Sequence, residues 1–160
     1  MGVTVANIEV GTQLAPLVKH MTLEKMVWFS GGDGRREKVN LHTDAAAAER
    51  DTGMKQPFAS GRISLGYASE LMSRFVGLDL FSHAGTIDFK FIKPVMPGDT
   101  ITVHGRVSQV KPVDHGALVI VDIYCENQHG EKTAVGSGSA VVPTGSGDVA
   151  QSLDSTALSS

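Results

Sequence analysis

The second half of the chain alternates between apolar and polar residues with a period of two, and this pattern constrains the fold more than any other feature. Four segments show it, separated by short runs rich in Gly, Pro and Asp: 86–95, 100–110, 117–127 and 132–142. Such alternation is typical of β-strands with one buried face, and the short turns favour pairing between consecutive strands. The sequence therefore predicts a sheet of four strands, which an early strand within residues 12–21 could complete.

A long helix is expected just before the sheet. Between residues 60 and 79, apolar side chains recur at helical spacing from Ile63 to Phe75, and the small residues Ser64 and Gly66 favour close approach of a neighbouring backbone. One long helix followed by four strands predicts an α+β domain in which an antiparallel sheet packs against that helix. A second subunit could cover the open edge of such a sheet.

Two shorter helices are expected closer to the N-terminus. Thr22 can cap the first, which ends at a pair of glycines, and its Trp28 and Phe29 suit a packing role. The second covers residues 44–50, where Thr43 or Asp44 can cap a run of four alanines before a glycine ends it.

Charge and hydropathy exclude several classes of partner. The net charge is −3, from 14 basic and 17 acidic residues, so we expect neither a nucleic acid nor a membrane partner. No apolar run approaches the roughly 20 residues that a membrane helix needs. The first residues lack the basic and apolar regions of a secretion signal, which favours a cytoplasmic protein.

A single cysteine limits the possible covalent and metal chemistry, and a polar C-terminal segment marks the expected end of the domain. Cys125 lies within one of the alternating segments, so a buried, unreactive thiol is expected and neither a disulfide nor a cysteine-rich metal site is possible. Residues 144–160 are small and polar without periodicity, which predicts a flexible tail after a single domain of residues 1–143. The scattered histidines do not show metal-ligand spacing, so we expect no metal and no cofactor.

Three segments, in the same order, resemble the MaoC-like dehydratases and (R)-specific enoyl-CoA hydratases. They are NLHTD at 40–44, PFASGRISLGYASELM at 57–72 and FIKPVMPGDTITVHGRV at 91–107. The likeness extends from about residue 8 to residue 142. It implies a hot-dog fold, in which an antiparallel sheet wraps a long central helix, and it implies a homodimer.

The resemblance also implies a reaction, in which water is added to or removed from the 2,3 double bond of an acyl thioester of coenzyme A or of an acyl carrier protein. His42 matches the family's catalytic histidine. Gly61 matches the glycine whose N–H polarises the thioester carbonyl, with Ser60 beside it at the start of the helix. Asn40 could orient His42 or the water. An isolated histidine at a helix entrance needs no catalytic role, but the resemblance favours one here.

The catalytic carboxylate is the point where the sequence departs from the family. The family has an aspartate five positions before the histidine, and Glu37 stands there in this chain. Asp33 has the expected glycine-rich neighbours but lies nine positions before His42, so the loop would carry four extra residues. We favour Asp33. Glu37 could serve instead, or the chemistry could use no carboxylate.

Two further interpretations stay open. The altered loop could mark a specialised dehydratase, cyclase or isomerase of a natural-product pathway, or the chain could be a non-catalytic subunit that pairs with an active partner. A thioesterase would need a carboxylate on the long helix, where Glu70 is expected on the solvent face. For the leading interpretation, the acyl chain is expected to pass Leu65, Tyr67 or Leu71, and Trp28 could line its pocket.

Overall fold

The computed structural model describes residues 7–31 and 39–144 of the 160-residue chain. The segment that holds Asp33 and Glu37 lies outside the described residues, as does the expected tail beyond Thr144. In chain order the elements are β1 Leu17–His20, α1 Leu23–Gly31, α2 Ala45–Thr52, α3 Gly61–Val76, α4 Leu78–Ala84, β2 Thr86–Phe91, β3 Thr100–Val113, β4 Gly116–Glu126 and β5 Lys132–Pro143.

The strands form one antiparallel sheet in the order β1-β3-β4-β5-β2. β3, β4 and β5 are joined by tight turns and make up its centre, while the short strands β1 and β2 form its edges. β2 comes before β3 in the chain but pairs with β5, from Thr86 opposite Ser139 to Phe91 opposite Ala134. The four alternating segments and the early strand predicted from the sequence are all present, which confirms the α+β class.

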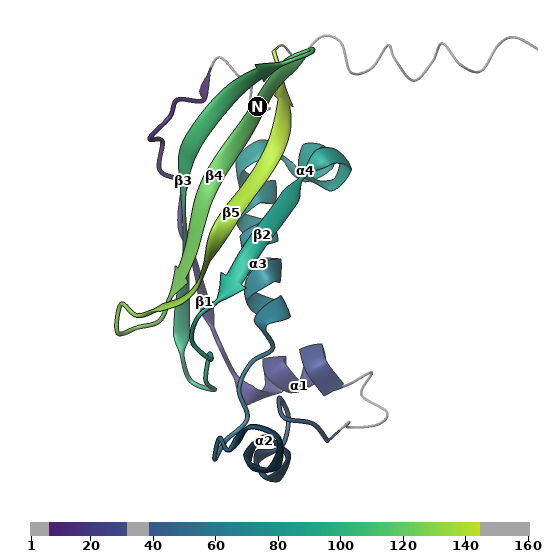
Figure 1. Ribbon diagram of the computed structural model, residues 1–160, viewed down its shortest axis with the longest axis vertical. Helices are drawn as coiled ribbons and strands as arrows, with labels where there is room; N and C mark the ends of the chain where they lie inside the picture. The colour runs from purple at the N-terminus through teal and green to yellow at the C-terminus, as the bar shows by residue number, and fades with distance from the viewer. Residues whose placement is uncertain (1–6, 32–38, 145–160) are drawn as a thin grey trace, which may run out of the picture.

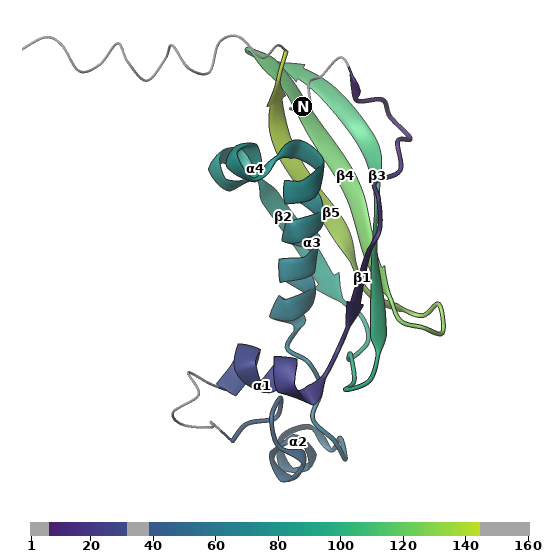
Figure 2. The same ribbon diagram turned by 180° about the vertical axis from the view of Figure 1, so that it is seen from behind.

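Helix α3 lies along the concave side of the curved sheet (Figures 1 and 2). Its buried face, which includes Leu71 and Met72, packs against glycines in the strands. A Cβ built on Gly105 would lie 2.9 Å from Leu71 Cδ2, and one on Gly138 would lie 2.8 Å from Met72 Cγ. The sheet glycines therefore permit the close approach of helix and sheet. Gly66, for which the sequence predicts this role, is exposed, and a Cβ built on it would have nothing within 4 Å.

Gly77 adopts a φ of 99° and ends α3 after Val76, close to the end of the predicted apolar pattern at Phe75. The chain then forms α4, a two-turn helix that the sequence pattern does not predict. Its residues Leu80 and Phe81 pack against the core.

Helices α1 and α2 lie beyond the end of the sheet, next to the start of α3 (Figure 1). Thr22 Oγ1 accepts the Lys25 N–H at 3.2 Å at the start of α1. Asp44 caps α2, accepting the Ala47 N–H at 2.8 Å, so both predicted helices are confirmed. Trp28 and Phe29 are 61% and 51% exposed, so the expected packing role is wrong for both.

Two further predictions can be compared with the structure. Cys125 is fully buried on β4, which confirms a buried thiol, and burial raises the pKa of this thiol to about 12. Among the described residues, no helix has the length and apolar character needed to cross a bilayer.

Candidate active site

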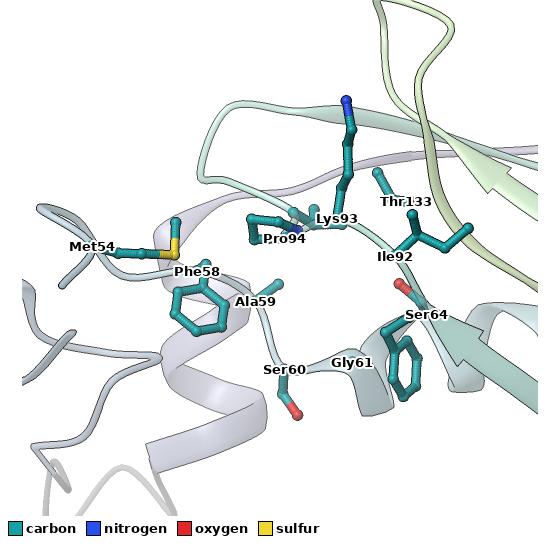
Figure 3. Close-up of a pocket in the computed structure, with 12 residues that line it drawn as sticks. Met54, Phe58, Ala59, Ser60, Gly61, Ser64, Ile92, Lys93, Pro94 and Thr133 are labelled. Carbon is teal, nitrogen blue, oxygen red and sulfur yellow. The ribbon is translucent and has the colours of Figure 1, made fainter. Parts of the chain in front are cut away.

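A cavity of about 350 Å³ opens at the N-terminus of α3 (Figure 3). Three parts of the chain form its walls: the segment that leads into α3 together with the first turn of that helix, the end of β2 with the loop that follows, and the start of β5. Most lining side chains are apolar, and the polar ones are few. The lining residues are Met54, Phe58, Ala59, Ser60, Gly61, Ser64, Phe91, Ile92, Lys93, Pro94, Val95 and Thr133.

Backbone hydrogen bonds hold these walls together. The Ala59 N–H donates to the Val95 carbonyl at 2.8 Å, which joins the entry to α3 with the loop after β2. The Ile92 N–H donates to the Thr133 carbonyl at 2.8 Å, which joins that loop to β5. An apolar hollow with a few polar groups, built on regular elements, is the usual form of a small-molecule site.

His42 lies in the loop that precedes α2 and is fixed to the wall of this cavity. Its Nδ1 is 2.7 Å from the carbonyl oxygen of Phe58, and its ring meets the Phe58 ring edge-on at 5.3 Å between centroids. A carbonyl only accepts hydrogen bonds, so Nδ1 carries the proton and Nε2 of the neutral ring is left as an acceptor. No described residue binds Nε2. The ring is half-buried and its orientation is fixed by Phe58, but His42 is not itself one of the residues that line the cavity.

Asn40 supports the histidine loop through its side-chain amide. Its Oδ1 accepts the backbone N–H of His42 at 2.8 Å, and its Nδ2 donates to the Ser30 carbonyl at 3.1 Å. Asn40 thus ties the histidine to the end of α1. The contact is with the backbone of His42 and not with its ring, so an orienting role for Asn40 stays a prediction. Asp44 is occupied as the cap of α2.

Gly61 is the first residue of α3 and lies directly on the cavity wall. Its N–H has no acceptor among the described residues, and the positive end of the helix dipole lies at the same place. A Cβ at Gly61 would be 2.9 Å from three atoms of the Phe91 ring, so any larger residue would meet that ring. Ser60 lines the cavity and accepts the Arg62 N–H at 3.4 Å as the helix cap.

The residues expected along the acyl path lie elsewhere. None of Leu65, Tyr67 and Leu71 lines the cavity beside Gly61. Leu71 is buried against the sheet, because the apolar stripe of α3 faces the core rather than the cavity. Trp28 is not a lining residue either. The two candidate carboxylates, Asp33 and Glu37, lie outside the described residues.

Glu70, which is expected on the solvent face, is half-exposed and paired with two basic side chains. Its Oε2 lies 2.6 Å from Lys19 Nζ on β1, and its Oε1 lies 2.7 Å from Arg74 Nη2 one turn along α3. The hydrogen bond from Lys19 is the main cause of a lowered pKa, with Arg74 adding to it. Glu70 therefore links the helix to the sheet edge, away from the cavity.

Sequence reasoning misses the contributions of Phe91, Ile92 and Ser64. The pattern assigns Phe91 and Ile92 only to a strand, and both are half-exposed at the rim of the cavity. Ser64 is expected to be a small residue that allows close packing, yet its side chain lines the cavity. Its spacing of three from Gly61 places both residues on one face of the helix, and this spacing is the signal available in the sequence.

With this geometry established, comparison with known proteins identifies the family. The model of the MaoC like domain matches residues 18–129, which is more than half of the chain. This chain belongs to the MaoC-like domain family. No curated protein sequence matches it significantly.

Solved structures give the fold of this MaoC-like domain. A monoamine oxidase regulatory protein from Archaeoglobus fulgidus is 25% identical, with a TM-score of 0.74 over 90% of this chain and 96% of that one. The R-hydratase PhaJ1 from Pseudomonas aeruginosa is 22% identical, with a TM-score of 0.70 over 90% and 88% of the two chains. The (R)-hydratase from A. caviae is 22% identical, with a TM-score of 0.62 over 86% and 98%. The fold is the hot-dog fold, as expected.

Proposed function

We propose that this chain is a hydro-lyase that adds water to, or removes it from, the 2,3 double bond of an acyl thioester. The observation that carries the proposal is the hydrogen bond from His42 Nδ1 to the carbonyl of Phe58, a residue that lines the same cavity as Gly61. His42 itself is not one of the residues that line the cavity. A base and an oxyanion donor are the two groups that this reaction needs. Family membership and the R-hydratases among the structural neighbours support the same reaction class.

The proposed chemistry follows from the polarity of an enoyl thioester. His42 Nε2 accepts a proton as a water oxygen bonds to C3, and the electrons of the double bond shift towards the thioester carbonyl. The resulting enolate oxygen is stabilised by the N–H of Gly61 and by the helix dipole. The protonated His42 then returns that proton to C2, which regenerates the neutral ring and gives the 3-hydroxyacyl thioester. A positioned acid–base group contributes about 10²–10⁴-fold to such a step.

A carboxylate is proposed as the partner of His42 on the same water. Asp33 is our first choice because its glycine-rich neighbours match the family setting, and Glu37 is the second. Residues 32–38 follow α1 in the chain, and the end of α1 is tied to the histidine loop through Asn40 and Ser30. That tether supports a carboxylate from this segment as the partner of His42.

The carrier of the acyl group, the assembly and the compartment are also proposals. Coenzyme A or an acyl carrier protein would hold the thioester, the chain would work as a homodimer, and the cytoplasm would be its location. A dimer is supported by the exposed apolar side chains Phe91 and Ile92 at the edge strand β2 and at the cavity rim, which a second subunit could cover.

The decisive experiment replaces the proposed base. His42→Ala should lower the rate of hydration of crotonyl-CoA, followed by the loss of its enoyl absorbance, by at least about 10²-fold. His83→Ala is the matched control, because His83 Nδ1 also bonds a backbone carbonyl, that of Asp79 at 2.8 Å, but lies on α4 away from the cavity. Equal activity of the two variants, with normal circular dichroism, would remove His42 from the mechanism.

A further inference from the structure

Ser64 is a buried polar side chain without a hydrogen-bond partner. It is only 4% exposed, it lines the cavity, and its hydroxyl bonds to no atom of the described residues. Among the described residues, the fully buried side-chain atom without a partner is Ser30 Oγ, so the unpartnered Ser64 hydroxyl is one that reaches the cavity. A hydroxyl that lines a cavity and has no protein partner is available to a ligand.

Ser64 lacks the hydrogen bond that a serine side chain within a helix usually makes to the helix backbone. A serine within a helix commonly donates its hydroxyl to the carbonyl four residues earlier, as Ser69 does to Leu65 at 3.0 Å on the same helix. The equivalent acceptor for Ser64 is the Ser60 carbonyl, which accepts only the Ile63 N–H, at 2.9 Å. Thr133, the other buried polar residue of the cavity, reaches the Cys125 carbonyl at 3.4 Å. Of these two buried hydroxyls, that of Ser64 is therefore the one that is available to hydrogen-bond a ligand.

The position of Ser64 on α3 directs its hydroxyl towards the oxyanion donor. Ser64 follows Gly61 by three residues, so the two lie one above the other on the same face of the helix. Side chains on a helix lean towards its N-terminus, which brings the Ser64 hydroxyl over the turn that Gly61 begins. Figure 3 shows this hydroxyl pointing into the space bounded by Ile92, Pro94 and Ala59.

We infer that the Ser64 hydroxyl is a second hydrogen-bond donor to the carbonyl oxygen of the thioester, beside the N–H of Gly61. The inference rests on the proposed function, because it names a further group that contacts the same substrate. A hydroxyl rotates freely about its C–O bond, so it can donate to the carbonyl in the ground state and to the enolate oxygen as charge develops. Two donors hold that oxygen in a fixed direction, which also fixes C3 relative to His42.

The test compares four proteins: wild type, Ser64→Ala, Ser64→Thr and Ser73→Ala. Alanine removes the hydroxyl and favours the helix, while threonine keeps the hydroxyl. Ser73 is the matched control, since it is a half-buried serine of α3 that lines neither the cavity nor the core. The measurements are kcat and KM for crotonyl-CoA, and the affinity for butyryl-CoA, a saturated thioester that cannot be hydrated, by titration calorimetry.

The expected result separates the transition state from the ground state. Ser64→Ala should lower kcat by about 10²-fold, the lower end of the effect of removing one oxyanion donor. It should weaken butyryl-CoA binding by only about tenfold or less, as for one neutral hydrogen bond. Ser64→Thr should recover part of kcat, and Ser73→Ala should match wild type. If Ser64→Ala does not reach the wild-type circular dichroism and Tm, Ser64→Cys, a weak donor of similar size, takes its place.

Each contrary outcome has a separate meaning. Normal kcat in folded Ser64→Ala, with an active wild type, overturns the role of Ser64 and leaves the proposed function standing. If the wild type does not hydrate crotonyl-CoA, the proposed function fails, and butyryl-CoA binding decides on Ser64 alone. Weaker binding by Ser64→Ala than by Ser73→Ala would then support the contact, whereas equal binding, or no binding by wild type, would overturn it.

Discussion

The imidazole of His42 and the backbone carbonyl of Phe58 are 2.7 Å apart, although 16 residues separate them in the chain. This one hydrogen bond joins the loop before α2 to the segment that enters α3. It also selects the tautomer of the ring, since the carbonyl can only accept. The orientation of the His42 ring thus depends on a main-chain atom, the carbonyl oxygen of Phe58. Because every residue has this carbonyl, replacing the Phe58 side chain does not remove the hydrogen bond.

The identity of the catalytic carboxylate can be tested by two isosteric changes. Asp33→Asn should lower kcat for crotonyl-CoA hydration by at least about 10²-fold, because an amide oxygen holds the water that it shares with His42 more weakly than a carboxylate does. Glu37→Gln should leave kcat near wild type. The reverse result would assign the role to Glu37, and normal kcat in both variants would show that His42 works without a carboxylate from this loop.

Glu70 should contribute to stability in a way that depends on pH. Its pKa in the folded protein is lowered from 4.5, chiefly by the hydrogen bond from Lys19, so the folded state favours the ionised carboxylate. The stabilisation is therefore present above pH 4.5 and is lost as the pH falls through the lower, folded-state value.

Urea unfolding of wild type and Glu70→Gln, at neutral pH and again well below pH 4.5, measures this effect. The two proteins should differ in free energy of unfolding at neutral pH and converge in acid. Glu49→Gln, at an exposed position on α2, controls for the loss of one negative charge. A difference that stays constant with pH would show that the ion pair with Lys19 adds no net stability.

The thiol of Cys125 should not react in the folded protein. Burial raises its pKa to about 12, so almost no thiolate is present near neutral pH, and the sheet blocks access. A coloured disulfide reagent at pH 8 should therefore react with the native chain only as fast as the chain unfolds, and at once in denaturant. Fast labelling of the native protein would show that the β4–β5 region opens locally.

Much of the fold could be predicted from the sequence because it depends on periodicity. Alternation with period two identifies strands β2 to β5, and the caps Thr22 and Asp44 locate two helices. Helix α4 escapes prediction because it is only two turns long, and the backbone conformation of Gly77 separates it from α3. The prediction for Trp28 and Phe29 is wrong because burial of an aromatic side chain depends on neighbours distant in sequence.

The site could be predicted only where short motifs matched the family. His42 and Gly61 are found in this way, and the structure ties the histidine loop to Phe58, which lines the same cavity as Gly61. The wall formed by Phe91, Ile92 and Thr133 could not be foreseen, since it requires the pairing of β2 with β5 and the hydrogen bonds of the loop after β2. Ser64 resembles a packing residue because a one-letter pattern does not show which face of a helix meets a cavity.

Two glycines on α3 offer a matched comparison of packing and function. Gly61→Ala places a methyl group 2.9 Å from the Phe91 ring and beside the proposed oxyanion donor. It should lower kcat/KM for crotonyl-CoA by about 10²-fold, the loss expected when reacting groups shift by about 1 Å. Adding Phe91→Ala should restore part of that activity, because the ring then no longer competes with the methyl group for space.

Gly66→Ala is the control on the same helix. Nothing lies within 4 Å of the added Cβ, and Gly66 is exposed, so activity should not change. Because glycine disfavours a helix interior, this variant should raise the free energy of unfolding by about 1 kcal/mol, measured by urea denaturation. If Gly61→Ala and Gly66→Ala had equal activity, the start of α3 would have no special role in the reaction, and the helix would serve the cavity only as a wall.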